Sequence, residues 1–467
     1  MKKTIFKTWL ILAIFFSSYN YVWAAEADSA ANLTPNNSIN TEIVEGYGSK
    51  LYTAIKVARD NLQTIIDQAE LNQVKPKVVT SYSAVIDAKF ALWNKKTNDL
   101  KFVDAKKTDK KIISDTDSGL DIKIKFANGV NTQYEVSNPD WLILAAIHPI
   151  YTNKGTAKKP KYQLNNVIYT PYQDYLADPF IVKAGQDFLS QKVEAVIAEL
   201  KNLRVRSKAY PYQLLTDTID AALVKSIIAI EHVSAASLLT GNVEDQLSKF
   251  YVILATNEHK AYAYSKSSAS ARGLVQFIPS TYKSVTKIRS DLTLNKNFEQ
   301  GMIDPYNAIK AQIGLLDINL SALPQVVKDK YSHDYKALGA YLAAVYNGGN
   351  TRVNKAVKIW GDEWAKDHKS AKVEYQKQYN TAKAEVSMLN KLLTNKKLTA
   401  AEKTKLQLSL KTAKANMAAL LNKVNSATAA NLKSETIQYV AKYYLVYDYF
   451  KKDGVELALL STSNREL

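Results

Sequence analysis

The stretch NEHKAYAYSKSSASARGLVQFIP, residues 257–279, sets one acidic residue in front of a long polar loop. Glu258 ends an apolar helical pattern over residues 243–258, and the loop behind it leads to Gly273-Leu-Val-Gln276 and a proline. A glutamate at a helix C-terminus meets the negative end of the helix dipole, and apolar neighbours would strip its water. Both effects favour the protonated carboxyl group that a general acid needs near neutral pH. On this residue alone, an ordinary solvated glutamate is the simpler interpretation.

Further motifs follow in a fixed order: Asp304-Pro-Tyr-Asn307-Ala-Ile, then Val345-Tyr346-Asn347-Gly348-Gly349, and finally Glu435-Thr-Ile-Gln-Tyr439-Val. With Glu258 and the Gly-Leu-Val-Gln block 15 to 18 positions after it, this series resembles the soluble lytic transglycosylase family, whose catalytic domain is lysozyme-like. The family pattern runs Glu-Ser, Gly-Leu-Met-Gln, Asp-Pro-x-x-Asn-Ile, Ala-Tyr-Asn-Ala-Gly and Glu-Thr-x-x-Tyr-Val. The resemblance covers about residues 215–360 and 430–455, which is less than half of the chain.

The resemblance implies cleavage of peptidoglycan glycan strands without consumption of water. A single glutamate, here Glu258, would protonate the glycosidic oxygen between N-acetylmuramic acid (MurNAc) and N-acetylglucosamine (GlcNAc). It would then act as base toward the C6 hydroxyl of the sugar, which closes a 1,6-anhydro ring. Because that hydroxyl belongs to the substrate, it is already held at high effective concentration. The second carboxylate of ordinary glycosidases is then unnecessary.

Substrate-binding residues are also implied by the resemblance, and the expected set is Gln276, Tyr346, Asn347, Tyr439, Gly273 and Val275. Gln276 would hydrogen-bond a sugar substituent from the floor of the groove. Tyr346 and Asn347 would line the cleft near the carboxyl group, and Tyr439 would complete its wall. The glycines would let the backbone approach the glycan. Asp304 and Asn307 are expected to be structural residues that cap and brace a helix.

Two positions depart from the family pattern. His259 replaces the serine after the glutamate, and a cationic histidine there would lower the pKa of Glu258 and hinder its acid role. Val275 replaces the methionine before the glutamine. Neither change removes the carboxylate, so we still expect activity.

Glu231, in Ile230-Glu231-His232, is a second glutamate at the end of a helical pattern. Counting 15 and 18 positions onward from it gives Gln246 and Lys249, with no glycine and no loop. We therefore expect Glu231 to be a helix surface or groove residue.

The chain begins with a basic segment, an apolar run over residues 9–16 and a small-residue cleavage site at Ala24. These features are typical of an export signal. We expect a signal peptide at 1–24, an α+β accessory region of unknown role at 25–205, and a lysozyme-like domain at 206–467. No later apolar run is long enough to span a bilayer, so an exported periplasmic protein is expected, with secretion as an alternative.

Within the accessory region, side chains alternate with period two over residues 78–137, which predicts antiparallel strands. One hairpin is expected around residues 93–102. Another is expected around a three-residue loop at 127–129, with Ile122 opposite Tyr134. From residue 171 onward the pattern is mostly helical, with helices expected at 178–203, 212–239 and 243–258. The fold class is therefore mainly α.

Residues 365–433 contain no glycine or proline and carry an apolar heptad seam typical of a coiled coil. The seam consists of Leu406, Leu410, Ala413, Met417, Leu420 and Val424, after an earlier run of Tyr379, Ala382, Val386, Leu389 and Leu393. Thr399 and Glu402 form a capping box between the two runs. We expect a long antiparallel helical hairpin, which acts as a self-sufficient strut, recruits a protein partner or guards a groove.

Cysteine is absent, which excludes disulfides and zinc–thiolate sites. The five histidines lack ligand spacing, and no cofactor or metal is expected. The formal charge of +18 suits an anionic partner such as a cell-wall polymer or a membrane surface, although a basic soluble surface explains it equally well. Export argues against a nucleic-acid partner.

Two other functions stay open. A hydrolytic, muramidase-like glycosidase would need a second carboxylate, and the spacing of Asp291 and Asp304 offers no support for one. A weakly active, wall-binding scaffold of an envelope assembly would act through the hairpin and the N-terminal region.

Overall fold

The computed structural model describes the following residues: 46–71, 78–79, 85–108, 110–114, 119–153, 155–156 and 159–463. The expected signal peptide lies outside these residues. The chain divides into two compact units, one formed by residues 1–203 and 244–314, the other by 204–243 and 315–467. Residues 244–314 thus belong with the N-terminal part. The expected domain boundary near residue 205 stays a prediction.

An antiparallel six-stranded sheet with strand order β1-β8-β7-β2-β3-β4 forms the base of the first unit. A separate two-stranded sheet pairs β5 with β6. Strands β2 and β3 confirm the hairpin predicted around residues 93–102. The strands are β1 (Val78–Val79), β2 (Ile86–Asn94), β3 (Leu100–Lys107), β4 (Ile112–Ser114), β5 (Ile122–Phe126), β6 (Gln133–Val136), β7 (Trp141–Asn153) and β8 (Tyr162–Tyr169).

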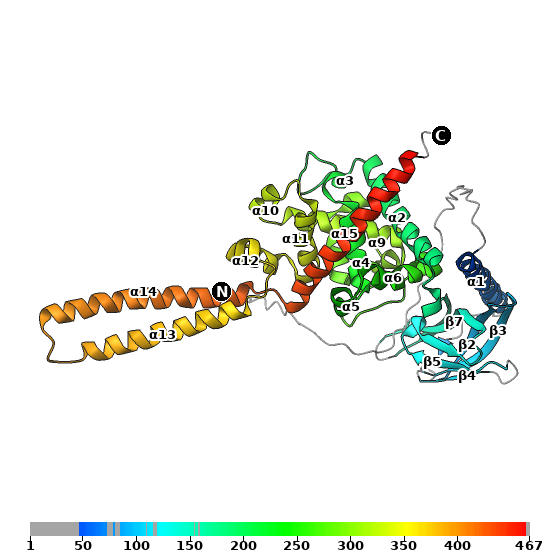
Figure 1. Ribbon diagram of the computed structural model, residues 1–467, viewed down its shortest axis with the longest axis horizontal. Helices are drawn as coiled ribbons and strands as arrows, with labels where there is room; N and C mark the ends of the chain where they lie inside the picture. Colours follow the sequence, from blue (N-terminus) through cyan, green and yellow to red (C-terminus); the bar gives the residue numbers. More distant parts are fainter. Residues whose placement is uncertain are drawn as a thin grey trace. The chain divides into compact units, whose positions relative to one another are not determined.

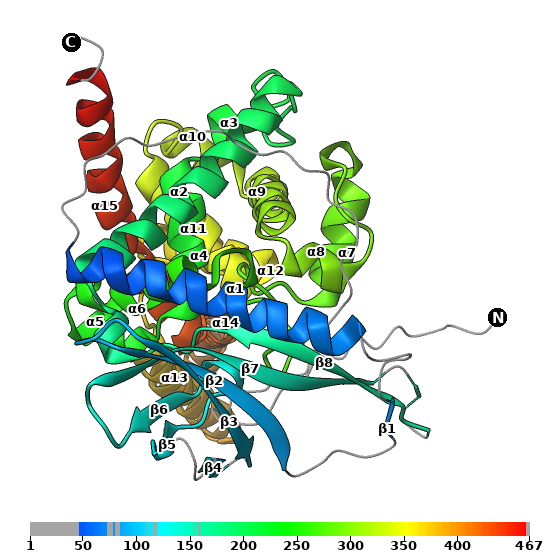
Figure 2. The same cartoon turned by 90° about the vertical axis from the view of Figure 1, so that its right-hand side faces the viewer.

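Strand β2 contributes side chains to two cores because successive residues of a strand point to opposite faces. Ala91 and Trp93 pack with α1 (Tyr47–Leu71), which lies across one face of the sheet (Figure 2). Phe90 and Leu92 pack on the other face with residues of β5 and β6. The alternating pattern of the sequence therefore determines which side chains of β2 pack on each face of the sheet.

The register of β5 and β6 differs from the prediction. Ile122 pairs with Val136, and Ile124 pairs with Tyr134, so the expected pairing of Ile122 with Tyr134 is wrong. The connection is longer than three residues, because a one-turn 3-10 helix begins at Gly129, the last residue of the expected loop, and extends to Asn131. The hydroxyl group of Thr132 closes this turn with two hydrogen bonds. The apolar side chains still face one another.

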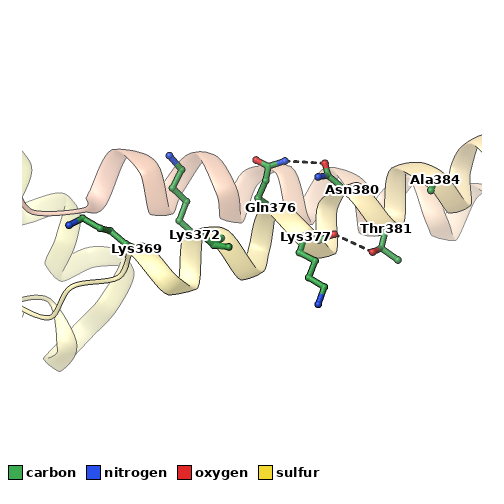
Figure 3. Close-up of a pocket in the computed structure, with 8 residues that line it drawn as sticks. Lys369, Lys372, Gln376, Lys377, Asn380, Thr381 and Ala384 are labelled. Carbon is green, nitrogen blue, oxygen red and sulfur yellow. Dashed lines mark hydrogen bonds between the residues drawn. The ribbon is translucent and has the colours of Figure 1, made fainter.

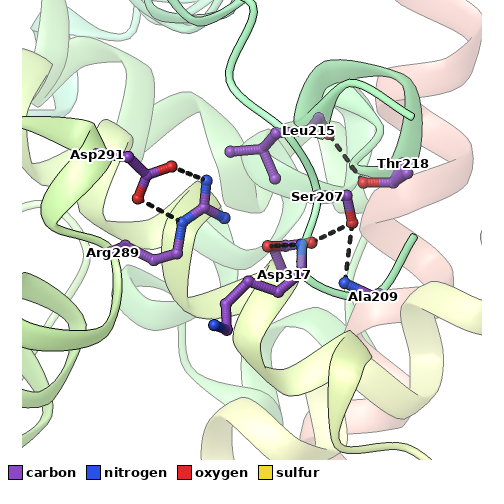
Figure 4. Close-up of polar contacts among 8 residues, drawn as sticks. Ser207, Ala209, Leu215, Thr218, Arg289, Asp291 and Asp317 are labelled. Atoms are coloured by element: carbon purple, nitrogen blue, oxygen red, sulfur yellow. Dashed lines mark hydrogen bonds and ion pairs between the residues drawn. The ribbon is translucent and has the colours of Figure 1, made fainter. Parts of the chain in front are cut away.

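The helices of the first unit pack closely. At Gly185 a Cβ atom would lie 2.0 Å from the carbonyl oxygen of Tyr251, so glycine is required for the contact between α2 and α6. Arg289 is only 1% exposed and forms a two-bond ion pair with Asp291 (Figure 4). The bounds of α2 and α6 confirm the predicted helices. These helices are α2 (Pro179–Asn202), α6 (Val243–Asn257), α7 (Pro279–Ile288), α8 (Phe298–Ile303) and the first part of α9 (Pro305–Ser321).

The second unit is helical, and the single helix expected over 212–239 is divided into three. The backbone is extended at Ile219 and Val233, and the side chains of Asp220 and Ser234 then cap the next helices. The helices are α3 (Leu215–Thr218), α4 (Ala221–His232), α5 (Ala235–Thr240), α10 (Gln325–Lys330), α11 (Tyr335–Gly348), α12 (Asn350–Trp360), α13 (Lys369–Leu393), α14 (Ala400–Ala430) and α15 (Ser434–Ser463).

Buried polar groups hold the ends of this unit in place. The carboxylate of Asp317, completely buried on α9, accepts hydrogen bonds from the hydroxyl group of Ser207 and the backbone N–H group of Lys208 (Figure 4). The hydroxyl group of Tyr447 on α15 donates to Asp220 at the start of α4 over 2.5 Å. These contacts satisfy donors and acceptors that would otherwise be costly to bury.

Helices α13 and α14 run side by side and confirm the predicted helical hairpin (Figure 1). Its core is the predicted seam, with Val386, Leu389 and Ala413 buried against Leu406, Leu410 and Met417. The capping box is also confirmed, since Thr399 and Glu402 exchange hydrogen bonds between side chain and backbone. The fold is thus mainly α, with a smaller α+β region and a long helical hairpin, as predicted. No helix in the described ranges is long and apolar enough to cross a membrane.

Replacing Thr399 with alanine should weaken the start of α14, because the cap satisfies an N–H group that the helix leaves unpaired. The expected loss is about 1 kcal/mol, or roughly fivefold faster hydrogen exchange at residues 400–403. Thr404→Ala is the matched control, since its hydroxyl donates within the helix to Ala400. Equal exchange in both variants would contradict the cap.

Candidate active site

Glu258 lies in the first unit, in a one-turn 3-10 helix after α6. Its side chain is 47% exposed, and its Oε1 atom lies 3.9 Å from Nζ of Lys56. The apolar face of α6 ends at the buried Asn257, and the backbone then turns left-handed at Glu258, with φ at 49°. Glu258 thus resembles the ordinary solvated glutamate that the residue alone suggested, and apolar neighbours do not exclude water from its carboxylate.

Gly273, Val275 and Gln276 lie in one loop of the first unit. Val275 is completely buried, so its side chain is a core residue, and the expected contact with a glycan is corrected. The amide group of Gln276 donates to Ser265 Oγ at 2.9 Å and to the carbonyl oxygen of Gly273 at 2.7 Å. Gly273 has φ at 70°, and a Cβ atom there would lie 2.1 Å from the carbonyl oxygen of Met302. Packing alone therefore requires this glycine.

Asp304 and Asn307 have the expected structural roles. The carboxylate of Asp304 accepts from the backbone of Tyr306 at the start of α9. The side chain of Asn307 accepts from the backbone of Asn295 and donates to the hydroxyl group of Tyr282. The motif therefore braces a helix start.

In the second unit, Tyr346, Asn347 and Tyr439 gather around Glu231, the glutamate that the sequence analysis set aside. Asn347 and Tyr439 line a pocket of about 200 Å³ together with Glu231. The other lining residues are Ile230, Val233, Ala235, Glu435, Gln438 and Lys442. Tyr346 is close enough for the carboxylate of Glu231 to add to the effect of burial in raising the pKa of its phenol.

Glu231 owes its position to the apolar helix that carries it. Helix α4 is buried from Ala222 to Ile230, and Glu231 is its penultimate residue. The chain becomes extended at Val233, so the carboxylate stands where the buried helix ends. Of the two positions expected for Glu231, a helix surface or a groove, the structure thus favours the groove.

Burial raises the pKa of Glu231 to about 7, from an ordinary value of 4.5. The hydroxyl group of Tyr439 donates to Oε1 of Glu231 at 2.6 Å, and this bond lowers the pKa. The charge of Lys442 also lowers it, while that of Glu435 raises it. A carboxyl group that titrates near neutral pH can donate a proton and take one back.

Helices α11 and α15 are joined beside this pocket. The hydroxyl group of Thr436 donates to Oδ1 of Asn347 over 2.8 Å. A Cβ atom at Gly348 would lie 2.9 Å from the side chain of Thr436, so this glycine lets the two helices meet. Two motifs far apart in the sequence are thus brought to one site.

Sequence reasoning missed Glu231, although one signal pointed to it. Residues 221–230 contain a single charged side chain, whereas residues 243–257 contain three. The more apolar helix is the more deeply buried one, and the acid at its end is the drier of the two.

The described residues hold no group of three or more His, Asp or Glu side chains placed to bind a metal ion.

Residues 242–368 match the family model described as Transglycosylase SLT domain. The matched range includes Glu258, the Gly273 block and the Tyr346 block, while Glu231 and Tyr439 lie outside it. No curated protein and no solved structure matches the chain. The match confirms the resemblance predicted from the motifs, and it implies a transglycosylase-type activity on peptidoglycan. The chain therefore carries a transglycosylase SLT domain, lysozyme-like and helical in fold.

Proposed function

We propose that this protein is a lytic transglycosylase that cleaves the MurNAc–GlcNAc β-1,4 bond of peptidoglycan and forms 1,6-anhydroMurNAc. We propose further that Glu231, rather than Glu258, is its acid and base. The observation that carries the assignment is the hydrogen bond between Glu231 and Tyr439 in a small pocket that Asn347 also lines. Export to the periplasm is part of the proposal, and its support is the signal-like start of the chain.

Protonated Glu231 would donate its proton to the glycosidic oxygen, and the bond from that oxygen to C1 of MurNAc would break. The GlcNAc-bearing part leaves as an alcohol, and positive charge develops at C1. The carboxylate of Glu231 then takes the proton of the C6 hydroxyl group while the C6 oxygen bonds to C1. The proton returns to Glu231, no water enters, and the products carry one new 1,6-anhydro ring.

Tyr439 would serve this cycle by holding the carboxylate. Its hydroxyl group donates to Oε1, so one oxygen of Glu231 is fixed and the other is left for proton transfer. Tyr439 is itself buried, and its pKa is raised well above its ordinary value by burial and by Glu231. It therefore stays a hydrogen-bond donor throughout the reaction.

A hydrolytic mechanism is the second candidate, and one observation favours it. Glu435 lines the same pocket as Glu231, so a second carboxylate is present that the sequence analysis did not consider. In an inverting glycosidase such a residue activates a water molecule on the opposite face of the sugar. The products would then end in a reducing sugar.

Mass spectrometry of fragments released from purified peptidoglycan tests both assignments. We expect fragments lighter by one water, ending in 1,6-anhydroMurNAc. Loss of a general acid should lower the rate by about 100-fold or more, so Glu231→Gln should lose this release. Glu258→Gln is the matched control and should keep most of it.

The reverse pattern, with loss only in Glu258→Gln, would restore the original assignment to Glu258. Reducing-end products from the wild type would establish hydrolysis and direct attention to Glu435.

Glu231 should also make stability depend on pH. Because its pKa is raised from 4.5 to about 7, the folded state binds the proton more tightly than the unfolded state. Stability is therefore lost as the pH rises from about 4.5 to 7, by about 3 kcal/mol. In urea unfolding, the free energy of unfolding of Glu231→Gln should rise relative to that of the wild type across this window. Above the window the difference between the two should stay constant. A difference that does not vary with pH would contradict the raised pKa of Glu231.

A wall-binding role of the hairpin is the second part of the proposal. Residues 369–430 contain twelve lysines and three glutamates, a formal charge of +9 out of +18 for the chain. An open hollow of about 900 Å³ along α13 has a largely apolar floor that includes Val373, and Lys369, Lys372 and Lys377 lie around it (Figure 3). Such a surface complements the carboxylates of peptidoglycan stem peptides. A protein partner of the hairpin stays a prediction.

Exchanging lysine for glutamate at residues 403, 405, 411 and 414 should weaken co-sedimentation with purified peptidoglycan several-fold. It should also reduce the sensitivity of binding to salt, since fewer charges are screened. Arginine at the same positions is the control and should preserve binding. Equal binding by both variants would remove the hairpin from wall recognition, and binding to anionic lipid vesicles alone would assign it to a membrane surface.

A further inference from the structure

We propose that Lys442 and Glu435 are positioning residues that act on Glu231 with opposite signs. Lys442 fixes the backbone on both sides of Glu231 and places a cation beside its carboxylate, and Glu435 opposes that cation. This inference rests on the proposed role of Glu231 as acid and base.

Lys442, a residue of α15, binds the C-terminal end of helix α4. The last carbonyl groups of a helix have no partner within it. Nζ of Lys442 donates to the carbonyl oxygen of Ile230 at 2.5 Å and to that of Val233 at 2.9 Å. These two residues flank Glu231, so one ammonium group ties down the turn that carries the carboxylate.

The ammonium group is held with little freedom. Lys442 is 8% exposed, and its Nζ lies 5.5 Å from the ring centre of Tyr439. A lysine is rarely buried to this degree without specific partners. Its two carbonyl bonds and the ring of Tyr439 supply them, so the charge has a fixed place in the pocket.

One face of α15 presents three different groups to Glu231. Glu435, Tyr439 and Lys442 are spaced four and three residues apart, which places them along one side of a helix. They supply an anion, a hydrogen-bond donor and a cation, and all three line the pocket. From α11, Tyr346 adds a neutral phenol. These are the ionisable groups that act on Glu231 within the described residues.

The reaction needs Glu231 in both protonation states, first as acid and then as base. The charge of Lys442 favours the carboxylate, and the charge of Glu435 favours the carboxylic acid. Burial favours the carboxylic acid, and the charge of Lys442 acts against it. Lys442 therefore restores basicity, and Glu435 limits how far it does so.

The test measures anhydro-product release against pH for four proteins: wild type, Lys442→Met, Lys442→Arg and Glu435→Gln. Methionine keeps an unbranched chain and removes the charge. The alkaline limb of kcat/KM should move up by about one pH unit in Lys442→Met, a tenfold gain in proton affinity. It should move down in Glu435→Gln and stay near the wild-type position in Lys442→Arg.

A second readout does not depend on activity. NMR of side-chain-labelled glutamate, with the Glu231 signal assigned by its absence in Glu231→Gln, reports the titration of this carboxyl group directly. The pKa of Glu231 should rise in Lys442→Met and fall in Glu435→Gln. Because Glu435 is exposed, Glu435→Gln carries the test where Lys442→Met does not fold, and Lys442→Arg is the control that keeps the charge.

The possible outcomes distinguish a failure of this inference from a failure of the catalytic assignment of Glu231. Unchanged titration of Glu231 in Glu435→Gln and Lys442→Met, or shifts in the same direction, would overturn the inference. If Glu231→Gln stays active while the titrations shift as expected, the electrostatic pair stands and the assignment of Glu231 as catalyst falls.

Discussion

The hydrogen bond between Tyr439 and Glu231 joins positions 208 residues apart, and the second unit is organised around it. It forms because α15 packs along α4, and that packing dries the end of α4 where the carboxylate stands. The same pair of helices is tied at its other end by Tyr447 and Asp220. If α15 shifted along α4, the carboxylate would lose its donor and gain water. The gain of water would remove the cause of the raised pKa that suits an acid near neutral pH.

Local patterns in the sequence predicted the elements whose causes are local. The hairpin of α13 and α14 follows from its heptad seam and from the Thr399 capping box, both of which are visible within a few residues. The failures concern longer distances. The register of β5 and β6 depends on Thr132 closing the turn, and the expected helix at 212–239 is divided where Asp220 and Ser234 offer new caps.

Part of the candidate site could be predicted from the sequence for the same reason. Tyr346, Asn347 and Tyr439 sit in short motifs, and the structure brings them together as one group. The glutamate could not be chosen by spacing, because a count of 15 positions assumes that nothing separates it from the Gly273 block. Both α4 and α6 are apolar helices with a glutamate at their C-terminal end, as the penultimate residue of α4 and directly after the last residue of α6. Which end is dry depends on the helices packed against it, and no local count contains that information.

The charged side chains of this protein lie in two different environments, one nearly excluded from water and the other exposed to it. On the face of α15 that lines the pocket, Lys442 is almost excluded from water, so its charge acts at short range and bulk salt reaches it poorly. The lysines of the hairpin are mostly exposed, where each contributes little alone and salt screens them. Chemistry and wall binding should therefore respond to different variables, the first to pH and the second to ionic strength. In the proposed function, a basic chain can thus hold an anionic polymer through many weak contacts without disturbing the single proton on which the proposed cleavage depends.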